Sequence, residues 1–331
     1  MKRSRNSQIL AYGVLMIVVS VLLVGLFGLA EKYINKVSSQ KGEEDGYSYT
    51  DGTQNGVYYG GYWYSLRSNM ETVLVMGIDS IMSDDEQRVN SQQADFLLLL
   101  IVDKMEKSLQ VLHINRDTMV NQPQTDAYGR PAGSRRAQLT LAHTVGDTDK
   151  DRCRNTVKAV ENLLYGIRID HYLSVTMDAI PVLNDSVGGV SVCLLDDFTF
   201  LDESFTKGEV VTLRGSQALG YVRERGALEN STNLHRMERQ RQYIAAFFEQ
   251  YSKVNPESTL DTMLEINEYM VSDCTVNQLS RLLDRVLSYS HDDILTIEGE
   301  STVGSSGYVE FYVDETELQN LVLNVFYKCQ E

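Results

Sequence analysis

The apolar and polar positions of the chain form their clearest pattern between Asp95 and Thr118. Phe96–Val102 is an unbroken apolar run, typical of a β-strand covered on both faces, whereas Leu109–Ile114 partly alternates with the two-residue period of a half-covered strand. We therefore expect an antiparallel hairpin, which brings Asp95 and the pair Arg116–Asp117 to the same edge of a sheet. Either acid alone would fit a strand end or a turn equally well, but the cluster favours a site.

The rest of the pattern alternates strands with helices. A β-branched run at Thr72–Gly77 predicts a strand that ends at Asp79, and the Gln-, Gly- and Arg-rich stretch Val120–Arg136 predicts a loop over the same edge. Further strands are expected at Ile169–Thr176, Val190–Leu195 and Val210–Leu213, a helix at Ala179–Asp185, and capping boxes at Thr275…Gln278 and Asp314…Glu317. The alternation indicates an α/β (α+β) class with a central mixed β-sheet covered by helices on both faces.

A second dense stretch, residues 216–251, is rich in arginine. Arg223 and Arg225 stand two residues apart, so in an extended chain they point to the same side. On the helix that follows, Arg236, Arg239 and Gln240 share one face through their spacing of three and four residues. An apolar stripe on another face anchors this helix and consists of Met237, Ile244, Phe248 and Tyr251.

Arginines from several stretches of an acidic protein indicate a site for a dense anion. Guanidinium groups match phosphate oxygens bidentately and keep their charge at physiological pH, as a pyrophosphate site requires. Asp79 and Asp95 are candidate ligands of a hard divalent cation that bridges the same phosphates. A solvated helix with ordinary ion pairs fits the alternation of Arg and Glu about as well, so the spacing leaves both interpretations open.

Composition and charge narrow the class of protein. The chain has 331 residues, of which 43% are hydrophobic, enough for one large domain or two small ones. A net charge of −16 argues against a nucleic-acid partner, which a local basic patch would have to hold against a repulsive field. The cysteines show no CxxC or Cys/His spacing, which argues against a structural zinc site, although one or two disulfides could form outside the cytosol. They are Cys153, Cys193, Cys274 and Cys329.

The N-terminal part of the sequence predicts a membrane anchor. Ile9–Ala30 carries no charge, and at ~1.5 Å per helical residue it can span the ~30 Å hydrocarbon layer. Basic residues in the tail 1–8 orient the tail to the cytoplasm and the remainder outside. A cleaved signal peptide is the alternative, but the apolar run exceeds the usual ~7–15 residues of such peptides. Residues 31–70, rich in Gly, Tyr and acid, predict a flexible extracytoplasmic linker to one domain at 71–331.

The chain resembles the LytR–CpsA–Psr family of Gram-positive cell envelopes. The matching segments lie between about Thr72 and Tyr251, and although each is weak alone, the ordered set is specific. They are VLVMGID, ADFLLLLIV, LHINRDTM, IDHYLSVTMDAIPVLNDSVGGVSV, LRGSQALGYVRER and RMERQRQ. Members of that family are membrane-anchored phosphotransferases that move glycopolymers from a polyprenyl-pyrophosphate carrier to peptidoglycan.

The resemblance implies roles for individual residues. Asp79 and Asp95 match the acids that hold Mg²⁺, with Mn²⁺ as an alternative, and an apolar tunnel between sheet and helices would house the prenyl tail. The residues that match the pyrophosphate-binding set are Arg116, Arg223, Arg225, Arg236, Arg239 and Gln240, of which the first three are also the expected catalytic residues. The implied partners are the lipid-linked glycopolymer, peptidoglycan and the membrane.

Two departures from the family pattern bear on the chemistry. Gln93 stands where the family has an arginine two residues before the second metal acid, and Asn233 stands where it has an acid proposed as the base. A polyprenyl-pyrophosphate hydrolase therefore remains an alternative. So does a non-catalytic precursor-binding or regulatory protein of the transcriptional-attenuator kind, although the tail 1–8 is too short to form a DNA-binding domain.

Overall fold

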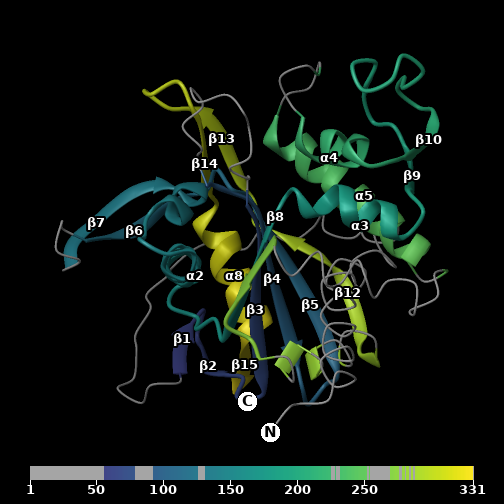
Figure 1. The fold of residues 1–331 in the computed structure, drawn as a ribbon. Helices are drawn as coiled ribbons and strands as arrows, with labels where there is room; N and C mark the ends of the chain where they lie inside the picture. Colours follow the sequence, from purple (N-terminus) through teal and green to yellow (C-terminus); the bar gives the residue numbers. More distant parts are fainter. Residues whose placement is uncertain are drawn as a thin grey trace, which may run out of the picture.

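A six-stranded mixed sheet forms the centre of the protein, shown in the computed structural model of Figure 1. The residues that the structure describes are 56–78, 92–125, 131–224, 228, 232–251, 253, 269–275, 278–279, 281–282, 285 and 288–330. The sheet has the order β11-β8-β3-β4-β5-β12, with parallel β3–β8 and β5–β12 pairs and antiparallel pairs elsewhere. Its strands are β3 (Met70–Ile78), β4 (Ala94–Asp103), β5 (Ser108–Ile114), β8 (His171–Thr176), β11 (Met270–Ser272) and β12 (Ser290–Thr296).

The antiparallel hairpin predicted from the two apolar runs is confirmed as β4 and β5. Its register pairs Leu97 with Ile114 and Asp103 with Ser108, so the start of β4 and the end of β5 share one edge of the sheet. The expectation that β5 is only half covered is wrong. Leu109 packs into the hydrophobic core on one face and Leu112 into the core on the other, because both faces of this central strand carry helices.

Helices cover both faces of the sheet, which confirms the predicted fold class (Figure 1). Side chains alternate along β3, so Val73 and Val75 join the core beneath three of the helices while Leu74 and Met76 join the core beneath the other two. The first three are α3 (Ala179–Ser186), α4 (Ser216–Arg223) and α5 (Asn233–Tyr251). The other two are α2 (Asp149–Leu163) and α8 (Glu315–Phe326).

Part of the stretch predicted as a linker is ordered. Within residues 31–70, β1 (Gly56–Tyr59) and β2 (Tyr62–Leu66) form a hairpin, and β2 also pairs with β15 (Tyr327–Gln330). The turn residues Gly60 and Gly61 have φ of +58° and +88°, as a two-residue hairpin turn of this kind requires. The ordered part therefore begins before residue 71, because pairing with the distant β15 stabilises a hairpin that is marginal alone.

The polar stretch Val120–Arg136 also differs from its prediction as a loop. It lies within a two-stranded hairpin whose partners are β6 (Met119–Thr125) and β7 (Pro131–Gln138). The 3-10 helix η1 (Leu139–Thr144) follows. Two further antiparallel pairs are β9 (Val190–Cys193) with β10 (Val210–Leu213), and β13 (Gly299–Val303) with β14 (Val309–Val313).

No helix within the described ranges is both long and apolar enough to cross a bilayer. The Ile9–Ala30 span, and with it the tail 1–8, lies outside those ranges. All four cysteines are free thiols.

Candidate active site

A tight turn after β5 positions the first arginine of the site. The Asn115 side-chain Oδ1 accepts a hydrogen bond from the Asp117 backbone N–H at 3.0 Å, and the Asn115 carbonyl accepts one from the Thr118 N–H at 3.1 Å. An asparagine that bonds the backbone two residues on mimics a backbone turn. Strand β14 supports this turn, because the Phe311 N–H donates to the Asp117 carbonyl at 2.9 Å. Arg116 is thereby held at the edge of the sheet where β4 begins.

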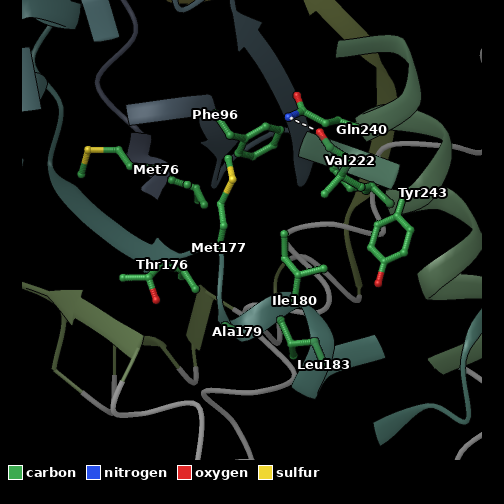
Figure 2. A pocket seen from close by; sticks show the side chains of 14 residues that line it. Met76, Phe96, Thr176, Met177, Ala179, Ile180, Leu183, Val222, Gln240 and Tyr243 are labelled. Carbon is green, nitrogen blue, oxygen red and sulfur yellow. Dashed lines mark hydrogen bonds between the residues drawn. The ribbon is translucent and has the colours of Figure 1, made fainter. Parts of the chain in front are cut away.

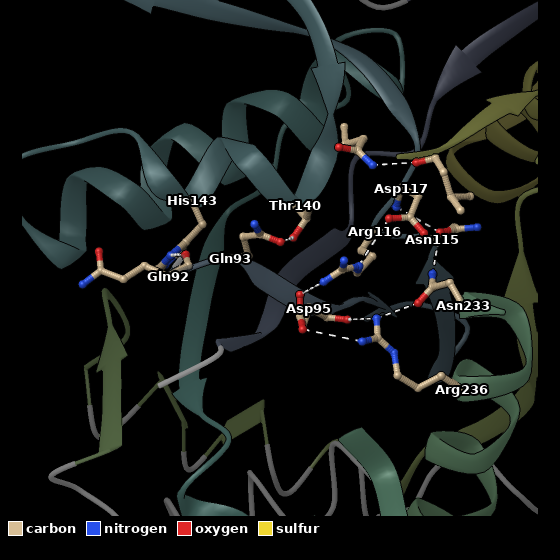
Figure 3. Close-up of polar contacts among 12 residues, drawn as sticks. Gln92, Gln93, Asp95, Asn115, Arg116, Asp117, Thr140, His143, Asn233 and Arg236 are labelled. Atoms are coloured by element: carbon tan, nitrogen blue, oxygen red, sulfur yellow. Dashed lines mark hydrogen bonds and ion pairs between the residues drawn. The ribbon is translucent and has the colours of Figure 1, made fainter. Parts of the chain in front are cut away.

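Asp95 lies between two guanidinium groups (Figure 3). Its Oδ1 accepts from Arg116 Nη1, and its Oδ2 lies 3.5 Å from Arg236 Nη1. Arg236 Nη2 also lies 3.4 Å from the Asp95 carbonyl oxygen. The side chains of Arg116, Asp95 and Arg236 are only 12%, 10% and 2% exposed, so their charges interact with little screening by solvent. Two guanidinium groups thus share the Asp95 carboxylate at this edge of the sheet.

Asn233 connects α5 to the Asn115 turn. Its Nδ2 donates to Asn115 Oδ1 at 2.7 Å, and its Oδ1 accepts from Arg236 Nη2 at 2.6 Å. Both ends of the amide are therefore used. An amide carries no proton-accepting charge, so Asn233 orients Arg236 and does not act as a base.

Asn115 is a site residue that the sequence does not indicate, whereas Asp117 is predicted only as a member of the cluster at this edge. Asp117 is 2% exposed, and its Oδ1 accepts from Arg116 Nε at 3.3 Å. Its Oδ2 is buried without a hydrogen-bond partner in the described part of the chain. The available signal was the run Asn115-Arg116-Asp117-Thr118, whose residue types favour a turn stabilised by its own side chains.

Arg239 is the most deeply buried of those members of the predicted phosphate-binding set that the structure describes. Its guanidinium is fully buried, with Nη1 3.1 Å from Asp196 Oδ2 and Nε donating to the Tyr221 carbonyl at 3.1 Å. Its Nη2 donates to the Glu224 carbonyl. His235 Nε2 lies 2.8 Å from the same Asp196 oxygen. These contacts join α5 to the C-terminal end of α4.

The remaining predicted residues are not among the described contacts of Asp95. Gln240 is buried and its Nε2 donates to the Val222 carbonyl at 3.3 Å, so it also contacts the end of α4. Arg223 is the last residue of α4 and is exposed. Asp79 and Arg225 lie outside the described residues. The structure thus brings Asp95, Arg116 and Arg236 together, and the convergence of the whole set stays a prediction.

Gln93, the first departure noted in the sequence, lies just before β4. Its Oε1 is 3.5 Å from the Thr140 hydroxyl of η1 (Figure 3). The neighbouring Gln92 carbonyl lies 2.8 Å from His143 Nδ1. This segment is therefore tied to η1 through polar side chains.

An apolar pocket lies between the sheet and the helices α3 and α5 (Figure 2). Its volume is about 110 Å³. Phe96, which lines the pocket, directly follows Asp95 in the sequence, and Val222, which also lines it, directly precedes Arg223. The pocket therefore adjoins the edge of the sheet that carries Asp95. The other lining residues are Val75, Met76, Gly77, Val175, Thr176, Met177, Ala179, Ile180, Leu183, Gln240, Tyr243 and Ile244. The extension of this pocket into a tunnel for a prenyl tail stays a prediction.

A neutral histidine lies beneath this site. Burial lowers the pKa of His113 to about 3, and the positive charges of Arg241 and Arg236 act in the same direction. His113 is 1% exposed, and the centre of its ring lies 5.0 Å from that of Phe96. The site therefore keeps an uncharged imidazole among its cations at physiological pH.

Comparison with known proteins gives one consistent family. The chain is 28% identical to the polyisoprenyl-teichoic acid–peptidoglycan teichoic acid transferase TagU of Halalkalibacterium halodurans, over 70% of each protein. It is 26% identical to TagV of Bacillus subtilis, a transferase of the same description, over 76% of this chain and 62% of the relative.

Solved structures agree with the fold. The crystal structure of Bacillus subtilis TagV matches with a TM-score of 0.57 and 26% identity, over 78% of this chain and 97% of that one. TagT bound to LIIa-WTA matches with a TM-score of 0.58 and 22% identity, over 78% and 91%, which is a likeness of fold. The LytR_cpsA_psr family model matches residues 31–325. Because that match spans most of the chain, the protein belongs to the LytR_cpsA_psr family.

Proposed function

We propose that this protein is a membrane-anchored transferase outside the cytoplasm that moves a glycopolymer from a polyprenyl-pyrophosphate carrier to peptidoglycan and forms a phosphodiester link. The observation that carries the proposal is Asp95 between Arg116 and Arg236 at the edge of an apolar pocket. Such a site offers charge for a pyrophosphate and an apolar surface for the lipid attached to it. Relatives named as teichoic acid transferases support the same reaction class.

The volume of the pocket sets how much lipid it can take as it stands. Engineered cavities of about 150 Å³ bind benzene, so a cavity of about 110 Å³ accommodates roughly one isoprene unit. A longer tail would extend beyond this cavity. Ile180 on α3, which lines the pocket, is partly buried and packs against the core.

In the proposed reaction, a sugar hydroxyl of peptidoglycan attacks the sugar-proximal phosphorus of the donor. A new P–O bond forms, the pyrophosphate bridge breaks, and polyprenyl phosphate leaves with the electron pair. Arg116 and Arg236 stabilise the negative charge that shifts onto the phosphate oxygens. Because Asn233 cannot take a proton, we assign the hydroxyl proton to a phosphate oxygen of the donor, which suits a loose transition state that needs little base catalysis.

Asp95 also fits a hard divalent cation. Its Oδ2 lies 3.5 Å from Arg236 Nη1, longer than the ~2.7–2.9 Å of a charge-assisted hydrogen bond, so this oxygen can serve as a ligand. Together with Asp79 it would hold Mg²⁺ or Mn²⁺, which would supply further positive charge to the phosphates.

One experiment separates this reaction from its two rivals. The full-length protein in detergent is incubated with a lipid-linked donor and peptidoglycan in H₂¹⁸O, and the products are identified by mass spectrometry. A muropeptide carrying the glycopolymer through a phosphate without ¹⁸O supports transfer. A free glycopolymer phosphate that contains ¹⁸O identifies a hydrolase, and bound but unchanged donor identifies a binding or regulatory protein.

A further inference from the structure

A short edge strand brings three metal-binding side chains together, away from the candidate active site. Strand β11 pairs antiparallel with β8, with Ser272 opposite Leu173. Continuing this register by two residues places Cys274 opposite His171. Directly opposed residues of an antiparallel pair have side chains on the same face, with Cβ atoms ~4.5–5.5 Å apart. Asp273 directly precedes Cys274. Its side chain is held beside β8 because its Oδ1 accepts a hydrogen bond from the Tyr172 N–H at 2.9 Å.

The ligand atoms of these three residues lie close enough together to share one metal ion. The His171 nitrogen, the Asp273 carboxylate oxygen and the Cys274 sulfur all lie within 4.8 Å of one another, and His171 Nδ1 is 3.6 Å from Asp273 Oδ1. Metal–ligand lengths of about 2.0–2.3 Å in a tetrahedral zinc site put neighbouring ligand atoms about 3.3–3.6 Å apart. His171 Nδ1 is buried and makes no hydrogen bond within the described ranges, so it is available to a metal.

We propose that His171, Asp273 and Cys274 bind one Zn²⁺ ion. Imidazole nitrogen, thiolate sulfur and carboxylate oxygen suit zinc, whereas Mg²⁺ takes oxygen ligands, so this site is distinct in chemistry from the one proposed at Asp95. Asp273 is 38% exposed in its side chain, which gives an ion a route from solvent and leaves a fourth position for water. Glu71, on the neighbouring strand β3, is already paired with Arg285 and Lys104 and is not counted as a ligand.

The role that follows is structural. Strand β11 contributes only Met270–Ser272 to the ladder, so few backbone hydrogen bonds hold the edge of the sheet. A metal shared between β8 and the residues directly after β11 fastens this edge. The absence of Cys/His spacing in the sequence argued against a zinc site, but His171 and Cys274 are far apart in the chain and only the strand pairing brings them together.

A substitution at Gln278 provides a second test, in which zinc binding is expected to become tighter. Its Nε2 lies 3.0 Å from His171 Nε2, while its Oε1 accepts from the Thr275 N–H at 2.8 Å. Metal at Nδ1 puts the ring proton on Nε2, which then faces an amide N–H₂ group instead of an acceptor. A carboxylate at position 278 accepts from both Nε2–H and Thr275, and hydrogen bonds of this kind strengthen a metal-bound imidazole. Gln278→Glu is therefore expected to tighten zinc binding.

The test uses the full-length protein in detergent after treatment with a chelator. Titration with Zn²⁺ is followed by calorimetry, and titration with Co²⁺ by the absorption band of a thiolate–cobalt bond. We expect one zinc per chain, a cobalt–thiolate band, and a higher Tm with zinc. Cys274→Ser should abolish the band and weaken zinc binding at least tenfold, as should His171→Gln. Asp273→Asn keeps the acceptor for Tyr172 and should weaken binding by a smaller factor.

Cys193→Ser is the matched control, because Cys193 is an exposed free cysteine on β9, in a different sheet. It should leave zinc affinity and the cobalt band unchanged. Circular dichroism of the metal-free variants checks that each is folded. The proposal is overturned if folded Cys274→Ser binds zinc as tightly as the wild type, if the band depends on Cys193, or if micromolar zinc does not bind. Weaker binding by Gln278→Glu than by the wild type would also contradict the Nδ1 geometry.

Discussion

The side chain of Asn233 accepts a hydrogen bond from Arg236, one turn later on α5, with a distance of 2.6 Å between Oδ1 and Nη2. The other end of the same amide donates to Asn115 at 2.7 Å. An amide meets both demands because it contains a donor and an acceptor, whereas a carboxylate contains only acceptors. Asn233 therefore fixes Arg236 relative to the turn that carries Arg116. An amide at position 233 orients Arg236, whereas a carboxylate at this position can also accept a proton.

Asn233→Asp tests this relationship. The carboxylate keeps the contact with Arg236 but loses the donor to Asn115 Oδ1, so the free energy of unfolding should fall by about 1–3 kcal/mol. The new carboxylate adds a base beside the phosphate site, so the transfer rate should rise, and this gain should be lost as the pH falls through the pKa of the carboxylate, which Arg236 lowers. Denaturant unfolding and the transfer assay measure the two effects. Asn233→Ala, which removes donor and acceptor together, should lower both stability and rate, and a rate increase in it would contradict the proposed orienting role.

Asp95→Ala should abolish transfer while the protein still binds polyprenyl phosphate. The substitution removes a candidate metal ligand and the carboxylate that bridges Arg116 and Arg236. Transfer assays with Mg²⁺ and native mass spectrometry of bound lipid measure the two properties. Asp103→Ala is the matched control, since Asp103 is a buried acid at the other end of β4 that pairs with Arg67 at 3.4 Å. It should lower stability but leave the specific activity of the folded protein intact, and retention of activity by Asp95→Ala would exclude Asp95 as a ligand.

The arginines of the predicted set should separate into two groups. Removal of one charge-assisted contact costs about 1.5–3 kcal/mol, so Arg116→Ala should reduce transfer roughly ten- to a hundredfold, and Arg116→Lys should recover only part of the loss. Arg239→Ala leaves Asp196 buried next to His235 without its guanidinium, and breaking a buried pair typically costs about 3–5 kcal/mol of folding free energy.

Unfolding curves and transfer rates of the two variants distinguish these outcomes. Both variants break buried ion pairs and are expected to unfold at a lower denaturant concentration than the wild type, but only Arg116→Ala is expected to lower the transfer rate of the folded protein. If Arg239→Ala kept wild-type stability and lost only donor binding, Arg239 would be a phosphate ligand and not a support of α4.

The parts of the fold that the sequence predicts are those fixed by local pattern. The Phe96–Val102 and Leu109–Ile114 runs predict their hairpin because an antiparallel pair joined by a short polar turn needs no distant partner. The β1–β2 hairpin was missed, since its stability depends on β15 at the other end of the chain. Periodicity within a short window contains no information on such a partner.

The residues of the candidate site also divide into those that the local pattern predicts and those that depend on distant parts of the chain. Asp95 and Arg116 could be brought together from the sequence because strand register alone places them at one edge. The burial of Arg239 against Asp196 could not, because the acid that pairs with a given arginine depends on how α5 packs against α4 and its flanking loop. Asn115 was overlooked because its contribution is a hydrogen bond to its own turn and not a charge.

His113 should make the stability of the protein depend on pH in a specific direction. Burial lowers its pKa in the folded protein to about 3, with Arg241 and Arg236 acting in the same sense, whereas an unfolded chain titrates near ~6.5. Between these two values the unfolded state binds a proton that the folded state excludes. Stability is therefore complete above about pH 6.5 and is lost as the pH falls toward about 3.

The change between pH 7 and pH 5 amounts to about 2 kcal/mol for one such histidine. His113→Gln, which does not titrate, should lack this contribution, so the difference in unfolding free energy between wild type and variant should shift by that amount in favour of the variant. Burial also lowers the pKa of His143. Because His143 is present in both proteins, its contribution cancels when the unfolding free energy of the variant is compared with that of the wild type. Urea unfolding of both proteins at the two pH values provides the measurement. An equal pH dependence in the two proteins would mean that His113 takes up a proton in the folded protein as readily as in the unfolded chain.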